Sequence, residues 1–145
     1  MTKHIWYLKS FLLLTGILGI FVFFSFVRAE EIDMNKIAWL ESRGNPMAYN
    51  KVSQARGTFQ ITPICLVDYN KCNGSNFSLD DLFSPTINKM IAVWYLEKRL
   101  PEQLRAYGKE VNIYNLLWAY HAGAKRVKDN ILPRTTREYI KSYFK

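Results

Sequence analysis

Residues 34–46, MNKIAWLESRGNP, combine the spacing of a helix with a carboxylate on its apolar face. The stripe at positions i, i+3, i+4 and i+7 holds Met34, Ile37, Ala38 and Glu41. The Gly-Asn-Pro sequence that closes the stretch ends the helix. Glu41 is therefore predicted near a helix C-terminus, facing inward.

An inward-facing carboxylate at this position suggests acid catalysis. Burial disfavours the anion and raises the pKa of Glu41, and the negative end of the helix dipole acts in the same direction. A carboxylic acid that keeps its proton near neutral pH can protonate a leaving oxygen. The local pattern is also compatible with an exposed Glu at a frayed helix end, so the choice depends on the rest of the chain.

The first 29 of 145 residues are typical of a secretory leader. Lys3 and Lys9 precede an uncharged run from Phe11 to Val27, and a small residue, Ala29, precedes the expected cleavage site. The run also reaches the lower limit for a membrane span, so an uncleaved anchor is the alternative. Either interpretation places residues 30–145 outside the cytoplasm, in the periplasm or cell envelope.

Residues 30–145 suffice for one compact domain, and their composition favours an anionic envelope partner. The whole chain has a net charge of +8, and the leader holds three basic and no acidic residues, which leaves +5. This charge suits anionic envelope polymers. The basic residues are scattered and form no nucleic-acid motif, so no nucleic-acid partner is predicted.

Two cysteines, Cys65 and Cys72, lie in the exported part. An oxidising compartment favours a disulfide between them, and their spacing differs from the C-x-x-C of redox sites. His121 is the only histidine outside the leader, so no metal or other cofactor is predicted.

Caps, prolines and glycines divide the exported part into short helices, and no segment alternates with period two. The expected fold is all-α, with a core of about seven short helices. After the helix of Glu41, helices are expected from Thr62-Pro63 to Asn70, from Ser78, from Ser84-Pro85 to Leu100, from Pro101 to Gly108, from Asn112 to Gly123, and over 135–143. The segment 71–76 is expected to be a loop.

Four blocks in order resemble the soluble lytic transglycosylase (SLT) family. They are ESRGNPMAYN (41–50), ARGTFQITP (55–63), AYHAG (119–123) and LPRTTREYI (132–140). They match the family patterns E-S-x-x-N-P-x-A, G-L-M-Q-I-x-P, A-Y-N-A-G and L-P-x-x-T-x-x-Y. The resemblance covers roughly residues 32–143 and implies a lysozyme-like, goose-type helical domain.

The resemblance also implies a reaction and its single acid/base. Family members cleave the β-1,4 bond between N-acetylmuramic acid and N-acetylglucosamine in peptidoglycan and leave a 1,6-anhydro-muramyl end. Glu41 matches the acid that protonates the glycosidic oxygen and then accepts the proton of the attacking C6 hydroxyl. No second carboxylate is required, whereas ordinary glycosidases use two. Each of the other carboxylates considered is explained by its local position in a turn, a helix cap or a solvated helix face. These are Asp68, Asp80, Asp81 and Glu138.

The resemblance assigns further residues to the substrate groove. Gln60 matches the groove glutamine, and Tyr120 matches a tyrosine whose hydroxyl lies near the acid, although core packing explains Tyr120 equally well. Substrate contacts are also expected from Phe59, Tyr49, Tyr139 and Ser53. Two departures from the family pattern, Phe59 for Met and His121 for Asn, bear on saccharide specificity.

Two alternatives remain open at this stage. One is a hydrolytic muramidase on the same fold, and the other is a non-catalytic peptidoglycan-binding component of an envelope-spanning assembly. The small size and the lack of a wall-binding domain suggest a partner that localises the protein, such as a secretion or conjugation-type machine.

Overall fold

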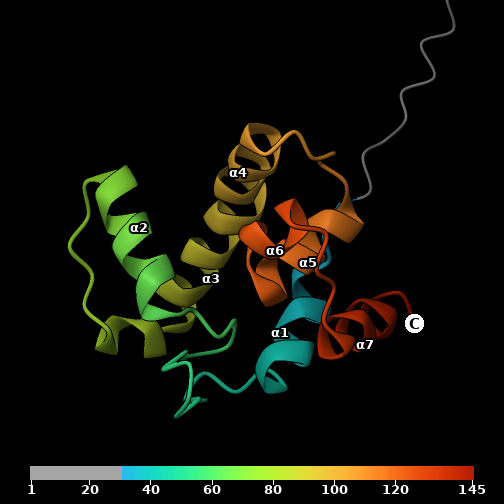
Figure 1. Cartoon of the computed structure of the whole chain (residues 1–145). Coiled ribbons are helices and arrows are strands. Elements are labelled where there is room, and N and C mark those ends of the chain that lie inside the picture. The colour runs from blue at the N-terminus through green and yellow to red at the C-terminus, as the bar shows by residue number, and fades with distance from the viewer. Residues whose placement is uncertain (1–30) are drawn as a thin grey trace, which may run out of the picture.

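The computed structural model describes residues 31–145, which form an all-helical domain (Figure 1). The leader predicted at residues 1–29 lies outside this part. The helices are α1 (Met34–Ser42), α2 (Pro63–Asn73), η1 (Asp80–Phe83, a 3₁₀ turn), α3 (Pro85–Trp94), η2 (Tyr95–Arg99, a π turn), α4 (Leu100–Ala106), α5 (Ile113–Ala122), α6 (Ala124–Lys128) and α7 (Arg134–Tyr143). This part of the chain contains no strand, only isolated bridges from Arg56 to Tyr49 and to Ile61. The predicted all-α class is confirmed.

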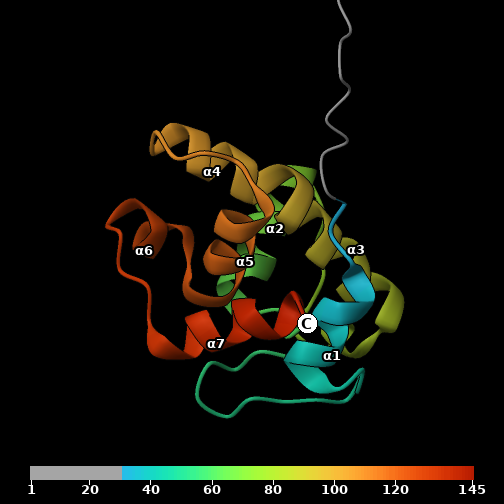
Figure 2. The ribbon, with the colours of Figure 1, turned by 90° about the vertical axis from the view of Figure 1, so that its right-hand side faces the viewer.

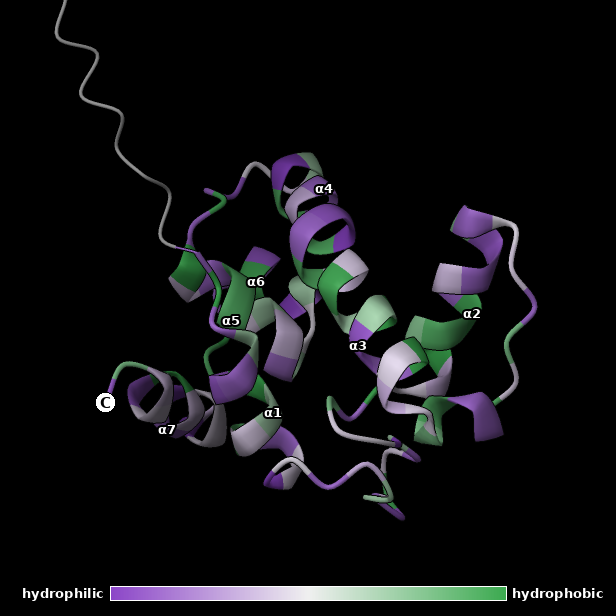
Figure 3. Ribbon diagram, turned by 180° about the vertical axis from the view of Figure 1, so that it is seen from behind, coloured by the Kyte–Doolittle hydropathy of each residue, from purple (hydrophilic) through white to green (hydrophobic). Residues whose placement is uncertain are grey.

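Helix α5 lies at the centre, in contact with α4, α6 and α7, and α1 packs against α7 (Figure 2). Two hydrogen bonds hold the start of α1 against the end of α7. The Asp33 amide donates to the Tyr143 hydroxyl at 2.7 Å, and Lys36 Nζ donates to the Tyr143 carbonyl at 2.9 Å. Hydrophobic and hydrophilic residues alternate along the helices (Figure 3), and the buried side chains of the described part are apolar except for Asn88 and Thr136. Every helix in the described part is too short or too polar to cross a bilayer.

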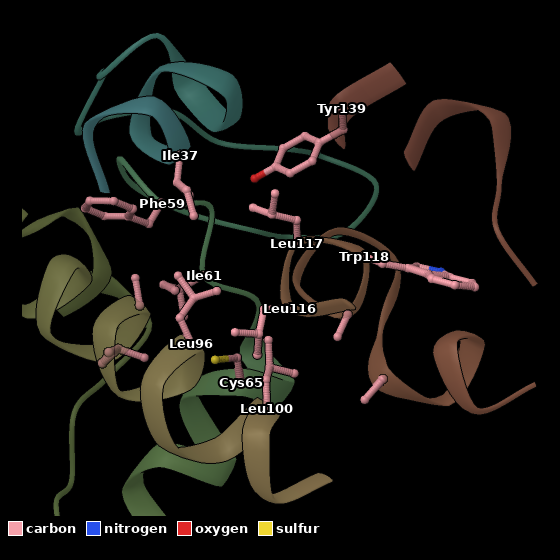
Figure 4. Packing of buried hydrophobic residues seen from close by; sticks show 14 of the residues in the cluster. Ile37, Phe59, Ile61, Cys65, Leu96, Leu100, Leu116, Leu117, Trp118 and Tyr139 are labelled. Atoms are coloured by element: carbon pink, nitrogen blue, oxygen red, sulfur yellow. The ribbon is translucent and has the colours of Figure 1, made fainter. Parts of the chain in front are cut away.

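The core joins residues of every helix from α1 to α7 and of the loop before α2 (Figure 4). Ile37, Ile61, Leu96, Leu100 and Leu117 are almost completely buried in it. Burial of such side chains is the main favourable term in folding, worth about 1.5–3 kcal/mol each. The C-terminus of α1 is thereby anchored beside α5, which brings Glu41 next to the third motif.

Local capping signals identify helix starts correctly. The Asn112 side chain accepts from the Asn115 amide at 2.8 Å and starts α5. Ser78 and Asp81 exchange reciprocal hydrogen bonds between side chain and backbone before η1, which confirms the capping box.

Pro101 lies in the first turn of α4, close to the predicted helix start, but α3, η2 and α4 run on without a break, so no gap separates the helices. The wide turn accommodates the proline: the Leu100 amide bonds to the Tyr95 carbonyl, five residues back. Tyr95, the first residue of this turn, is partly buried against the core. On α3, Met90 is 39% exposed while Asn88 is completely buried, the reverse of what their polarities favour.

The predicted disulfide between Cys65 and Cys72 is wrong, and both cysteines are free. Helix α2 runs through Asn73, so Cys72 lies on the helix and not in the expected loop. Seven residues along a helix span about 10 Å, beyond the roughly 7 Å that a disulfide can bridge. Cys65 is buried and Cys72 is exposed.

We expect a reducing agent to leave the melting temperature of the exported domain unchanged. A short-loop disulfide would contribute about 2–3 kcal/mol, a loss that a thermal melt detects easily. Thiol titration should find one reactive group in the folded protein, Cys72, and two after denaturation, because burial raises the pKa of the Cys65 thiol to about 12. A melting temperature that falls on reduction would contradict this assignment.

Candidate active site

A cavity of about 440 Å³ lies beside the C-terminus of α1, within the range of small-ligand sites. Its walls come from α1, the loop before α2, the start of α2, η2 and the end of α5. They are formed by Glu41, Asn50, Ser53, Ala55, Gln60, Ile61, Thr62, Cys65, Tyr95, Ala119, Tyr120, His121 and Gly123. Three of the four sequence motifs therefore meet in one space.

Glu41 is the one carboxylate among the described residues that line this cavity. Burial raises the pKa of its carboxyl from 4.5 to about 7, and the nearby Tyr139 hydroxyl partly opposes this shift. The predicted inward orientation of Glu41 thus agrees with the structure. Near neutral pH the group exists in both protonation states, as an acid/base requires.

The other carboxylates considered are engaged elsewhere. Asp68 forms a two-point ion pair with Arg99, with its shorter contact at 2.6 Å, and Glu138 pairs with Arg134 at 2.9 Å. Asp81 caps η1, and Asp80 is exposed in the same turn. None of these side chains lines the cavity with Glu41.

Gln60 faces the cavity in a constrained conformation. Its φ of 48° is in the left-handed region, held by the paired hydrogen bonds of 3.0 Å between Arg56 and Ile61. Its amide nitrogen donates to the Gly57 carbonyl at 3.0 Å. The amide oxygen accepts no hydrogen bond within the described residues and is available to a ligand.

Asn50 lines the cavity but was not singled out by the sequence analysis. Its side-chain oxygen accepts from the Val52 and Ser53 amides at 2.9 and 3.1 Å, an Asx turn that leaves its NH₂ group as a donor. An asparagine three residues before a serine in a loop was the available signal. Ser53 also lines the cavity, as expected, and its hydroxyl accepts from the Ala55 amide.

Tyr120 lines the cavity, and its hydroxyl donates to the Phe59 carbonyl at 2.7 Å. Its proton is therefore occupied, and the oxygen can still accept from a protonated Glu41. Burial, and next the charge of Glu41, raise the pKa of Tyr120 well above its usual value. Burial also raises the pKa of Tyr95 to about 12, so Glu41 and His121 are the cavity groups that titrate nearest neutrality.

The structure does not bring three expected contact residues to the cavity wall. Phe59 is buried in the core, and only its carbonyl reaches the site, through Tyr120. Tyr49 is 48% exposed, with the Arg56 guanidinium over its ring, and does not line the cavity. Tyr139 is buried and does not line the cavity, although its hydroxyl interacts with the Glu41 carboxyl and lowers the pKa of that group.

Two residues outside the cavity hold its loop. The Ser42 hydroxyl donates to the Thr58 carbonyl at 2.7 Å, which ties α1 to the second motif. Asn88, from α3, accepts from the Phe59 amide and donates to the Arg56 and Leu82 carbonyls at 2.7–2.9 Å. No local pattern identifies Asn88, because its partners are distant in sequence.

A comparison with protein families matches residues 29–143 to the transglycosylase SLT domain. The chain matches no curated protein and no solved structure closely enough to add a relative. The family match supports a peptidoglycan-modifying role of the lytic transglycosylase type, and the all-helical fold agrees with a lysozyme-like domain. The chain belongs to the transglycosylase SLT domain family.

Proposed function

We propose that this protein is a lytic transglycosylase that cleaves the β-1,4 bond between N-acetylmuramic acid and N-acetylglucosamine. The observation that carries the proposal is the single carboxylate, Glu41, in a cavity lined by three of the family's motifs. Hydrolytic glycosidases use two carboxylates around the scissile bond, and the described cavity supplies only one. An intramolecular nucleophile of the substrate removes the need for the second.

In the proposed mechanism Glu41 acts twice. Its carboxylic acid protonates the glycosidic oxygen, and the bond from that oxygen to C1 of the muramyl sugar breaks. The resulting carboxylate then takes the proton of the muramyl C6 hydroxyl as its oxygen bonds to C1. Glu41 ends in its starting state, and the product carries a 1,6-anhydro ring.

The polar groups opposite Glu41 suit an amino sugar. Asn50 offers a fixed NH₂ donor, and Gln60 offers a fixed carbonyl acceptor. An acetamido group carries one acceptor and one donor and can pair with both. This pairing supports a substrate rich in N-acetyl groups.

The leader supports a proposal about location. Basic residues, a long uncharged apolar run and a small residue before the expected cleavage site favour export to the periplasm or envelope. A partner such as a secretion or conjugation-type machine would localise the small domain on the wall. Binding to the membrane is proposed only for a form that keeps the leader.

Mass spectrometry of fragments released from purified sacculi tests the reaction. Residues 30–145 should release fragments with anhydro-muramyl ends. Reducing muramic ends would instead identify a hydrolytic muramidase. Saturable binding to sacculi without release by a folded protein would identify a non-catalytic component, and either outcome would overturn the proposal.

We expect kcat/KM to fall as the pH rises above about 7. Glu41 must be protonated to act as the acid, and its pKa is raised to about 7, so the competent fraction decreases above this value. The decline should approach roughly tenfold per pH unit. Initial rates of fragment release at low substrate, from pH 5 to 9, measure this, and a rate independent of pH across this interval would contradict it.

A further inference from the structure

The residue that departs from the family's third motif, His121, touches the residue behind the acid. His121 is at the end of α5 and forms part of the cavity wall. Its ring packs on the Tyr139 ring of α7, with centroids 4.5 Å apart and planes inclined by 39°. A tilted ring contact at this distance restricts how far the Tyr139 ring can move.

A buried threonine fixes the orientation of the His121 ring. The Thr136 hydroxyl, on a residue only 1% exposed, lies 3.0 Å from His121 Nδ1 and has no other hydrogen bond within the described residues. A buried hydroxyl proton needs an acceptor, which assigns the acceptor role to Nδ1 and the ring proton to Nε2. Burial lowers the pKa of His121, in agreement with a neutral ring.

The Tyr139 hydroxyl is the group that this contact controls. It is buried and forms no hydrogen bond of ordinary geometry within the described residues. It points inward from α7 toward Ile37 of α1 and Leu117 of α5 (Figure 4). Its interaction with Glu41 favours the charged carboxylate and lowers the Glu41 pKa against the effect of burial. A small movement of this hydroxyl therefore changes the pKa of Glu41.

We propose that His121 is a positioning residue that holds the Tyr139 hydroxyl against Glu41, with Thr136 fixing the His121 ring. The proposal rests on the proposed role of Glu41 as the acid. Three elements then act together: α5 supplies His121, α7 supplies Thr136 and Tyr139, and α1 supplies Glu41. Tyr120, the other titratable group near Glu41, is held separately by the Phe59 carbonyl.

The test measures the pKa of the Glu41 carboxyl directly, by carbon NMR of residues 30–145 labelled at glutamate side chains, with Glu41→Gln to assign the signal. Tyr139→Phe should raise this pKa by roughly half a unit to one unit, since it removes a group that stabilises the anion. His121→Asn should raise it in the same direction. The double variant should add nothing beyond Tyr139→Phe.

The double variant separates positioning from direct charge. If His121 acted on Glu41 through its own charge, its replacement would still shift the pKa in the Tyr139→Phe background. Such a persistent shift, or no shift in His121→Asn, would overturn the proposal. Thr136→Val, which preserves shape, should also raise the pKa and serves as the second route if His121→Asn does not fold.

A matched control and an activity measurement complete the design. Tyr114→Phe removes a hydroxyl from an exposed tyrosine of α5 outside the cavity and should leave the Glu41 pKa unchanged. The midpoint of the kcat/KM profile should rise in His121→Asn as the NMR value does. Because the NMR readout does not need turnover, a wild-type protein that releases no anhydro-muramyl fragments would overturn the proposed function separately.

Discussion

Glu41→Gln should abolish the release of anhydro-muramyl fragments from sacculi. The amide has the shape of the acid but cannot donate a proton to the glycosidic oxygen or accept one from the C6 hydroxyl. Loss of an acid/base group costs about 10²–10⁴-fold, and Glu41 performs both proton transfers in the proposed reaction. Mass spectrometry of the soluble fragments measures the loss. Wild-type activity in this variant would remove Glu41 from the mechanism.

The same substitution should make the domain more stable at pH 8. The folded state raises the Glu41 pKa from 4.5 to about 7, so it binds the proton more tightly than the unfolded chain does. This group therefore lowers the stability as the pH rises from 4.5 to 7, and the penalty is complete above 7. Its size is at most about 3 kcal/mol. Urea unfolding at pH 4 and pH 8 should show a gain only at the higher pH.

That stability difference is the control for the activity result. An inactive variant that unfolds at a higher urea concentration than the wild type at pH 8 has lost chemistry and not structure. Glu41→Ala is a less useful comparison, because it removes the whole side chain and opens a cavity. An inactive and destabilised Glu41→Gln protein would leave folding as the explanation and contradict the linkage argument.

The sequence predicts the parts of this structure that depend on neighbours along the chain. The period that places Glu41 with Ile37 requires only one helix, and the caps at Asn112 and Ser78 depend on hydrogen bonds over three residues. The end of α2 was missed, and the disulfide prediction failed with it. The Gly74 cap that ends α2 is also a local signal. The loop predicted over 71–76 is nevertheless wrong for its first three residues, because α2 continues through Cys72 to Asn73.

Residues whose roles depend on distant contacts were not predictable in this way. Asn88 resembles a polar residue on a helix surface, yet its side chain binds backbone groups of the loop that carries Gln60. Tyr95 lines the cavity at the start of the π turn, and no local sequence pattern predicts that turn. The family pattern gives the position of His121, but only the three-dimensional structure places its ring on Tyr139.

Gly57→Ala should cause the largest loss of stability among the substitutions considered. Gly57 has a φ of +77°, and an added Cβ would lie 2.2 Å from the Leu82 carbonyl oxygen and 2.4 Å from the Asn88 side-chain nitrogen. The left-handed conformation costs alanine about 1–2 kcal/mol. The contact with a backbone oxygen cannot be relieved by a rotamer change, so the loop must move away from α3.

That movement breaks the hydrogen bonds by which Asn88 holds the loop, each worth about 1 kcal/mol, and exposes buried polar groups. We expect a total loss of about 3–5 kcal/mol, a large part of the stability of a domain of this size. Gly74→Ala is the matched control, since Gly74 has a φ of +62° and open space around its Cβ position. It should lose only about 1–2 kcal/mol. Urea unfolding measures both losses: Gly74→Ala carries the backbone strain alone, and Gly57→Ala carries the same strain and the steric contact. Equal losses of stability would refute the close packing of Gly57 against Asn88 that fixes Gln60 at the cavity.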